Sequence, residues 1–329
     1  MNQTGMLIVV PSRLGVAESF AIKVKVLGPV RPVPCENGAF TTKPGQGGPF
    51  NLNVQRKIQY LDNALPEWTG RLVVDGGPDL EGPKEILFDG RNQGVFPGDV
   101  RPIRACGGFR WRKPGFHFVT LTDPVSGTAV SSNPVRVTAD VPRERLYWGD
   151  PHWQTYFSDG IRCPEELYAF ARDEAFLDFG AISDHVEAVT DRQWDYMTAV
   201  TNDFNEPGKF TTLVGQEWTH CEIGHRNIYY RGNHGPVLRS NDGRYDSLPK
   251  LWAALEPHEA IAVPHHSANK VMGVDWSLGW NPRFEKAVEI HSVWGNSECY
   301  AEDGNPMPIT TLGGEVRGRH VVDALRRGY

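Results

Sequence analysis

The pattern of hydrophobic residues changes near residue 140, and this change constrains the fold more than any other feature of the sequence. Before it, short runs in which apolar and polar residues alternate are each closed by Gly, Pro, Asp or Asn. Alternation with a period of two is typical of half-buried strands joined by tight turns. The runs are SFAIKVKVLG, RKIQYLD, GRLVVDG, KEILFDG, GFHFVTLTD and NPVRVTAD. We predict an N-terminal antiparallel β-sandwich over residues 1–140.

After this point strand-like runs alternate with helical patterns. The helical patterns cover residues 164–176, 192–204, 248–256 and 317–328. The strand-like runs cover residues 145–149, 177–183, 210–215, 259–264 and 286–293. Such alternation is typical of βα units, which favour a largely parallel sheet or barrel. We predict a second, α/β domain over residues 145–329.

Composition excludes several classes of protein. A net charge of −6 gives no reason to expect nucleic acid as a partner, so a small-molecule substrate is expected. No run approaches the roughly 18 apolar residues of a membrane span, and the first residues lack a secretory signal pattern, so no membrane partner is expected. The five cysteines are scattered and form no Cys-x-x-Cys pair. They predict reduced thiols and a cytoplasmic location. The oligomeric state stays open.

Residues able to bind metals follow the predicted strands of the second domain. Of the 11 histidines, His117 alone lies before residue 150. The carboxyl ends of parallel strands share one face of a βα fold, so residues far apart in sequence converge there. The residues at these ends are His152, Asp184 with His185, Glu217, and His265 with His266.

The residue types indicate a metal centre. Histidine and carboxylate ligands without cysteine suit Zn, Mn or Fe. Two or three such ions can lower the pKa of a bridging water, which favours hydrolysis. Each motif alone also has an ordinary structural interpretation. The Ser-Asp-Gly at Ser158 is a common turn, and the Ser-Asp-His at Ser183 can cap a helix.

Five segments contain these residues in order: GDPHWQTYFSDG, AISDHVE, VGQEWTH, GHRN and AVPHH. Together they resemble the motifs of the polymerase and histidinol phosphatase (PHP) superfamily of metal-dependent phosphoesterases. The chain is most similar to the branch described as DUF3604, in which a β-rich region precedes the first motif. The resemblance implies a distorted βα barrel holding two or three divalent ions. It implies the ligands His152, Asp159, His185, Glu217, His225 and His265, with His266 as second choice for the last. The implied catalytic residues are Asp159, Glu217 and His265.

Two features depart from that resemblance. Gln154 stands where many members have the second histidine of a His-x-His motif, so one imidazole is replaced by a weakly binding amide, and we expect a changed cluster. The sequence also ends at HVVDALRRGY without the late Asp-x-His motif of the family. We count about five barrel-type strands, fewer than a closed barrel needs. We therefore expect a truncated chain and an incomplete barrel, inactive on its own if the missing strands are required.

Two cations are candidates for substrate binding. Arg226 and Lys270 lie in or near the predicted loops and are able to hold a phosphate group, although ordinary surface charges are the favoured interpretation of both. The predicted function is a metal-dependent hydrolase, in first place a phosphoesterase. Two alternatives stay open: an amidohydrolase-like C–N or ester hydrolase, and a non-catalytic binding protein with a degenerate barrel.

Overall fold

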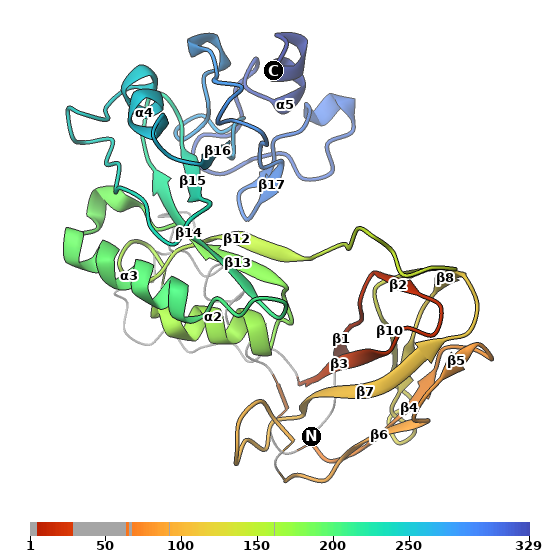
Figure 1. Ribbon diagram of the computed structural model, residues 1–329. Coiled ribbons are helices and arrows are strands. Elements are labelled where there is room, and N and C mark those ends of the chain that lie inside the picture. The colour runs from red at the N-terminus through yellow and green to blue at the C-terminus, as the bar shows by residue number, and fades with distance from the viewer. Residues whose placement is uncertain (1–4, 29–63, 66–67, 92, 161) are drawn as a thin grey trace, which may run out of the picture. The chain divides into compact units, whose positions relative to one another are not determined.

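The computed structural model describes residues 5–28, 64–65, 68–91, 93–160 and 162–329 (Figure 1). Contacts between residues divide the chain into two compact units. The first unit comprises Met1–Trp148 with Phe170–Leu177, and the second comprises Gly149–Ala169 with Asp178–Tyr329. The predicted strand at residues 56–62 lies outside the described residues, as does Cys35.

In its described residues the first unit is built from short strands in three sheets. The sheet orders are β1-β3-β7-β5, β10-β9-β4-β6 and β2-β11-β8. Their pairings are antiparallel except for β2 with β11, which is parallel. The strands are β1 (Gly5–Val9), β2 (Arg13–Gly15), β3 (Phe20–Leu27), β4 (Gly70–Asp75), β5 (Leu80–Glu81), β6 (Glu85–Phe88), β7 (Ile103–Trp111), β8 (Gly115–His117), β9 (Thr120–Thr122), β10 (Ala129–Ser131) and β11 (Val135–Thr138).

Alternate residues of these strands form one hydrophobic core. In β3 the side chains of Ile22, Val24 and Val26 are fully buried, because residues two apart point to the same face of a sheet. Strands of all three sheets contribute to this core, with Phe109 and Trp111 of β7 among its largest side chains. Burial of one face of each strand therefore explains why apolar and polar residues alternate in this part of the sequence.

The second unit contains a mixed sheet of five strands in the order β12-β13-β14-β15-β16. The strands β12, β13 and β14 are parallel, whereas β15 is antiparallel to both of its neighbours, β14 and β16. Their bounds are β12 (Gly149–Trp153), β13 (Phe179–Ile182), β14 (Thr211–Trp218), β15 (Arg226–Tyr230) and β16 (Ala260–Pro264). A two-stranded ribbon follows, formed by β17 (His291–Ser292) and β18 (Gly295–Asn296).

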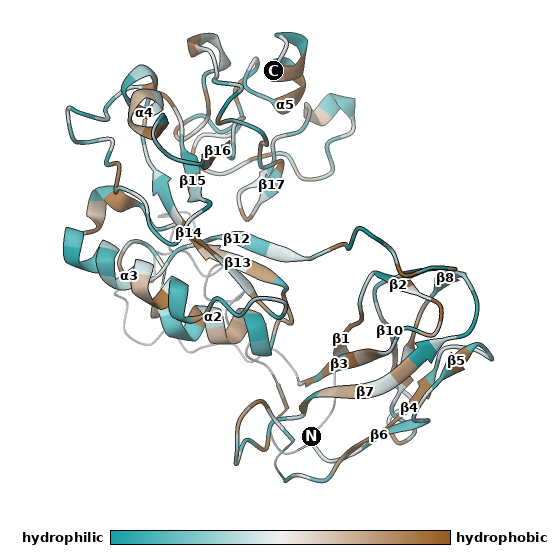
Figure 2. Cartoon of the chain, in the orientation of Figure 1, coloured by the Kyte–Doolittle hydropathy of each residue, from teal (hydrophilic) through white to brown (hydrophobic). Residues whose placement is uncertain are grey.

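The helices are few and short. They are α2 (Pro164–Asp173), α3 (Asp191–Asp203), α4 (Leu248–Leu255) and α5 (Val321–Arg326), with 3₁₀ turns η1 (Val186–Ala188), η2 (Trp276–Leu278) and η3 (Ala301–Asp303). Helix α3 begins with a capping box, in which Thr190 and Gln193 satisfy each other's backbone N–H groups. It lies beside β13 and β14 (Figure 1), and it is buried through Trp194, Met197 and Val200. Figure 2 shows hydrophilic residues along the rest of this helix.

The predicted fold class, a β-sandwich followed by a partial βα barrel, is wrong. The strands form several small sheets, and no βα barrel is present in the described residues. The barrel prediction failed because the chain turns back after β14 and adds β15 antiparallel, which a βα barrel does not allow. Residues 286–293, predicted as one strand, contain only the two residues of β17. No helix in the described residues is long and apolar enough to cross a membrane.

A buried ion-pair network in the first unit predicts a pH-dependent stability. Glu174 accepts a hydrogen bond from Lys25 at 2.8 Å and also pairs with Arg101. Burial raises the pKa of Glu174, but these two cations outweigh it and lower the pKa below its ordinary value. A carboxylate with a lowered folded-state pKa stabilises the fold above its unfolded-state pKa, and this contribution is lost as pH falls through the folded-state pKa.

We therefore expect Glu174→Gln to lower the free energy of unfolding by about 1–3 kcal/mol at pH 7, with the difference shrinking toward about pH 3. Urea denaturation at both pH values measures it. The control Glu144→Gln removes a carboxylate that is exposed and 4.0 Å from Arg13, and it should change little. A Glu174→Gln effect of equal size at both pH values would contradict the assignment.

Candidate metal centre

One edge of the five-stranded sheet gathers the predicted ligands. His152 lies in β12, His185 follows β13, Glu217 lies near the end of β14, and His265 follows β16. Because β16 runs parallel to β14, the carboxyl ends of these four strands meet at the same edge. The reversed strand β15 brings its beginning to this edge, which places His225, directly before Arg226, beside the others.

Glu217 is the centre of the cluster, and its Oε1 faces three imidazoles. Nδ1 of His225 lies 2.7 Å from this oxygen, Nε2 of His265 lies 3.0 Å from it, and Nδ1 of His185 lies 3.4 Å from it. The Glu217 side chain is 1% exposed. Nδ1 of His185 also lies 2.6 Å from the hydroxyl of Thr219, which fixes the orientation of that ring.

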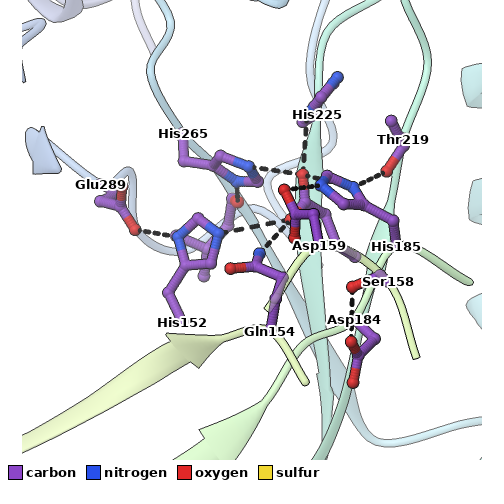
Figure 3. Close-up of polar contacts among 12 residues, drawn as sticks. His152, Gln154, Ser158, Asp159, Asp184, His185, Thr219, His225, His265 and Glu289 are labelled. Atoms are coloured by element: carbon purple, nitrogen blue, oxygen red, sulfur yellow. Dashed lines mark hydrogen bonds and ion pairs between the residues drawn. The ribbon is translucent and has the colours of Figure 1, made fainter. Parts of the chain in front are cut away.

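The other oxygen, Oε2 of Glu217, faces the loop after β12. Gln154 donates a hydrogen bond to it from Nε2 at 2.9 Å, and Nε2 of His152 lies 3.4 Å away. The second nitrogen of His152, Nδ1, lies 2.7 Å from Oε2 of Glu289 (Figure 3). Glu289 follows β16 in the chain, and its backbone N–H donates to Pro264.

His266 and Asp159 complete the set. The His266 ring lies 4.8 Å from that of His225 and 4.3 Å from that of His265, between centroids. Its backbone has a φ of 33°, a left-handed conformation that is strained for a residue with a side chain. Oδ2 of Asp159 lies 3.5 Å from Nε2 of His185. The structure therefore brings together all eight predicted ligands.

Asp184 holds the loop that carries Gln154 and Asp159. It accepts hydrogen bonds from the backbone N–H of Thr155 at 2.8 Å, from the Thr155 hydroxyl at 2.9 Å and from the Ser158 hydroxyl. At Gly160 a Cβ would lie 2.0 Å from the carbonyl oxygen of Gln154, so only glycine fits this tight loop. The sequence Ser-Asp-Gly is a turn as well as part of the cluster.

The charges of the cluster are set by burial and by the central carboxylate. Burial alone would raise the pKa of Glu217, but the facing histidines lower it well below its usual range. Burial lowers the pKa of His152 and His185, yet the carboxylates beside them raise the pKa of His152 to about 10 and that of His185 to about 9. Burial lowers the pKa of His265, and it lowers that of His266 far below the ordinary value. Neutral imidazoles of this kind are the form that binds metals.

The donor set fits divalent metal ions. Ligand atoms of Glu217, His225, His265 and His266 all lie within 4.8 Å of one another, and all four residues are buried. Among the predicted ligands and Glu289, three buried polar atoms have no hydrogen-bond partner in the described part of the chain: Nδ1 of His266, Oδ1 of Asp159 and Oε1 of Glu289. Unsatisfied buried polar atoms are rare in folded proteins and often indicate a ligand. Nitrogen and oxygen donors without sulfur suit Zn, Mn or Fe.

Two site residues were not identified from the sequence as part of the cluster. Glu289 lies within the run KAVEIHSV, which was interpreted only as a strand, although a carboxylate directly after an apolar run was the same signal that identified Glu217. Asn227 pairs with Glu217 in the sheet register, so its side chain lies on the same face, and it is 1% exposed. Its motif, GHRN, had been considered for its histidine and arginine.

The two predicted substrate cations do not join the cluster by any contact among the described residues. Arg226 is fully buried, and its Nε donates to Oε1 of Glu285 at 2.9 Å. It precedes Asn227 in β15, and alternation therefore directs it to the face opposite Glu217. Lys270 is exposed in the loop after His266. The position of Arg226 argues against the predicted role in phosphate binding.

Comparisons with known proteins support one part of the resemblance. Residues 163–302 match the model of the family described as "Protein of unknown function (DUF3604)". This match includes His185, Glu217, His225, His265 and Glu289, whereas His152 precedes it. An uncharacterized protein of Chlamydia pneumoniae is 28% identical over 222 residues, which are 66% of this chain and 35% of that protein. Uncharacterized proteins of Chlamydia trachomatis and Chlamydia muridarum are 27% and 26% identical over the same length. The chain thus spans about a third of the length of these relatives.

Removal of Asp184 should destabilise the second unit. The Asp184→Ala variant leaves the buried Thr155 N–H and two hydroxyls without their acceptor, so we expect the free energy of unfolding to fall by about 2–4 kcal/mol. Urea denaturation measures this loss. The control Asp195→Ala changes an exposed residue of α3 and should stay within about 0.5 kcal/mol of the parent. Equal stabilities of the two variants would show that Asp184 does not hold the loop.

Measurements of stability and of kinetics distinguish a structural role of Arg226 from a role in substrate binding. If the Arg226–Glu285 pair is structural, Arg226→Met should cost about 3–5 kcal/mol, because it leaves Glu285 buried without its cation. The double variant Arg226→Met/Glu285→Leu should recover part of this loss, since it buries no unpaired charge. Thermal and urea denaturation test both. An unchanged stability of Arg226→Met, together with a raised KM in any reaction found, would restore the substrate-binding role.

Proposed function

We propose that this chain forms the metal centre of a metal-dependent hydrolase, with phosphate esters as the first substrate class to test. The observation that carries the proposal is the buried Glu217 carboxylate, which is contacted by four histidines from different strands. Burying this many polar and charged groups costs free energy of folding, because each polar group must be paired and each charge compensated. A role in binding accounts for this cost.

The phosphoesterase class rests on the order of motifs, which is similar to that of the PHP superfamily, and the amidohydrolase-like alternative differs only in the bond that is cleaved. Divalent ions held here would lower the pKa of a bound water and neutralise oxygens of a phosphate group. The matched region spans 35% of the length of the first relative. The proposal covers both cases, a reaction performed by this chain alone and one performed by a longer protein that contains it.

The residues of the chain have separable roles in this proposal. His152, His185, His225, His265 and His266 are the nitrogen ligands, and Glu217 offers one oxygen to each side of the cluster. Asp159 is the candidate proton acceptor, because its Oδ1 is buried and has no other partner. His185 orients Asp159 through Oδ2, at 3.5 Å. Thr219 and Glu289 position His185 and His152, respectively, through the ring nitrogen that each contacts.

The test is hydrolysis by purified protein loaded with Zn, Mn or Fe. A panel of nitrophenyl phosphate monoesters, phosphate diesters, carboxylic esters and anilides distinguishes the phosphoesterase from the C–N or ester hydrolase. We expect metal-dependent turnover of a phosphate ester, and a loss of at least about 100-fold in Glu217→Gln and Asp159→Asn. The matched control His234→Ala removes an exposed histidine outside the cluster and should retain full turnover.

Elemental analysis of the same samples separates binding from catalysis. Bound metal without turnover of any ester or amide would leave a metal-binding protein and refute the hydrolase. Folded protein that takes up no ion, as judged by elemental analysis and circular dichroism, would refute the metal centre itself. Turnover that persists in Glu217→Gln would show that another protein in the sample is responsible.

A further inference from the structure

The two oxygens of Glu217 face unlike surroundings. Among the described residues, Oε1 is contacted by three imidazoles, at 2.7, 3.0 and 3.4 Å. Oε2 is contacted by the Gln154 amide at 2.9 Å and by one imidazole, that of His152, at 3.4 Å. A carboxylate with two such different sides cannot offer two equivalent metal positions.

The Oε1 side has the properties of a strong position. Glu217, His225, His265 and His266 supply ligand atoms that lie within 4.8 Å of one another. His266 is 5% exposed, and its Nδ1 has no hydrogen-bond partner. Its strained backbone, with a φ of 33°, is a cost that bound metal would offset. Three imidazoles and a carboxylate oxygen form a favourable set for Zn or Mn.

The Oε2 side is weaker in two respects. Gln154 uses its N–H to bond the carboxylate, and this group cannot ligate a cation. The amide oxygen that remains is a neutral, poor ligand for Zn, in contrast to an imidazole. This side still contains Nε2 of His152, whose ring Glu289 holds through Nδ1, so a position exists but lacks one strong ligand.

We propose that the cluster binds divalent ions in two unequal positions, and that Gln154 sets the difference between them. The tight position comprises Glu217 Oε1, His225, His265 and His266, and the weak position comprises Glu217 Oε2 and His152, whose ring Glu289 orients. This proposal rests on the proposed metal centre. Its consequence is that the second ion exchanges with the surroundings, so the concentration of free metal regulates how much of the protein carries the complete cluster.

The test is metal binding by the full chain, measured with Zn alone and with Mn alone against a chelator of known affinity. We expect one tightly held ion per chain and a second whose Kd is at least about 10-fold higher, a difference of about 1.4 kcal/mol. In Gln154→His the imidazole completes the weak position, so the second Kd should fall by at least about 10-fold while the first is unchanged. Gln154→Ala is the matched control, because it removes the amide without adding a ligand, and its second ion should stay weak. His266→Ala should weaken the first ion.

The outcomes separate this inference from the function on which it rests. Two ions of equal affinity in the parent chain, or a second Kd that is the same in Gln154→His and Gln154→Ala, would overturn the inference and leave the metal centre intact. A stoichiometry of one ion in the parent and two in Gln154→His would support it. Folded protein that binds no ion in any variant would overturn both the inference and the proposed function. Circular dichroism on each sample establishes that the variants are folded.

Discussion

The buried charge of Glu217 is the constraint on which the second unit depends. A carboxylate that is 1% exposed costs several kcal/mol to bury unless donors or cations surround it. These donors come from four strands and from the loop after β12, so no local segment is able to supply them. The cluster is therefore a tertiary interaction, and its formation requires the order and direction of β12 to β16.

The mixed sheet satisfies this requirement by reversing the direction of one strand. Four parallel strands end at one edge, and the reversed strand β15 begins there. A short loop, residues 219–225, connects β14 to β15 and reverses the direction of the chain. Gly224 lies near the end of this loop. Gly224 has a φ of 95°, and a Cβ there would lie 2.7 Å from the carbonyl oxygen of Gly273. Glycine is thus required both for the backbone conformation and for the close approach of the following loop.

The sequence allowed the grouping of the candidate ligands around Glu217 to be predicted better than the fold. The positions of β13, α3, α4 and β16 agree with their hydrophobic patterns, because burial of one face leaves a periodic trace in the sequence. Strand direction leaves no such trace. The segment RNIYY is buried at all five positions, so its lack of alternation concealed β15. The convergence of these histidines and carboxylates was predicted from the wrong architecture and still occurs, because it depends on which end of each strand carries them. The face on which Arg226 lies could not be predicted either. It depends on the alternation of side chains along β15, and this strand was not predicted from the sequence.

The loop from Gln154 to Gly160 connects the chemistry of the cluster to the packing beneath it. Its amide faces Glu217, its carboxylate faces His185, and both are fixed by the hydrogen bonds that Asp184 accepts from Thr155 and Ser158. Asp184 belongs to the segment that also carries His185, and its carbonyl oxygen accepts from the backbone N–H of Glu217. One short segment therefore positions groups on both sides of the central carboxylate. A substitution at Gln154 changes the group that faces Oε2 of Glu217 without altering these supports, because the supporting hydrogen bonds begin at Thr155. The side chain at this position can thus vary while the geometry of the remaining cluster is retained.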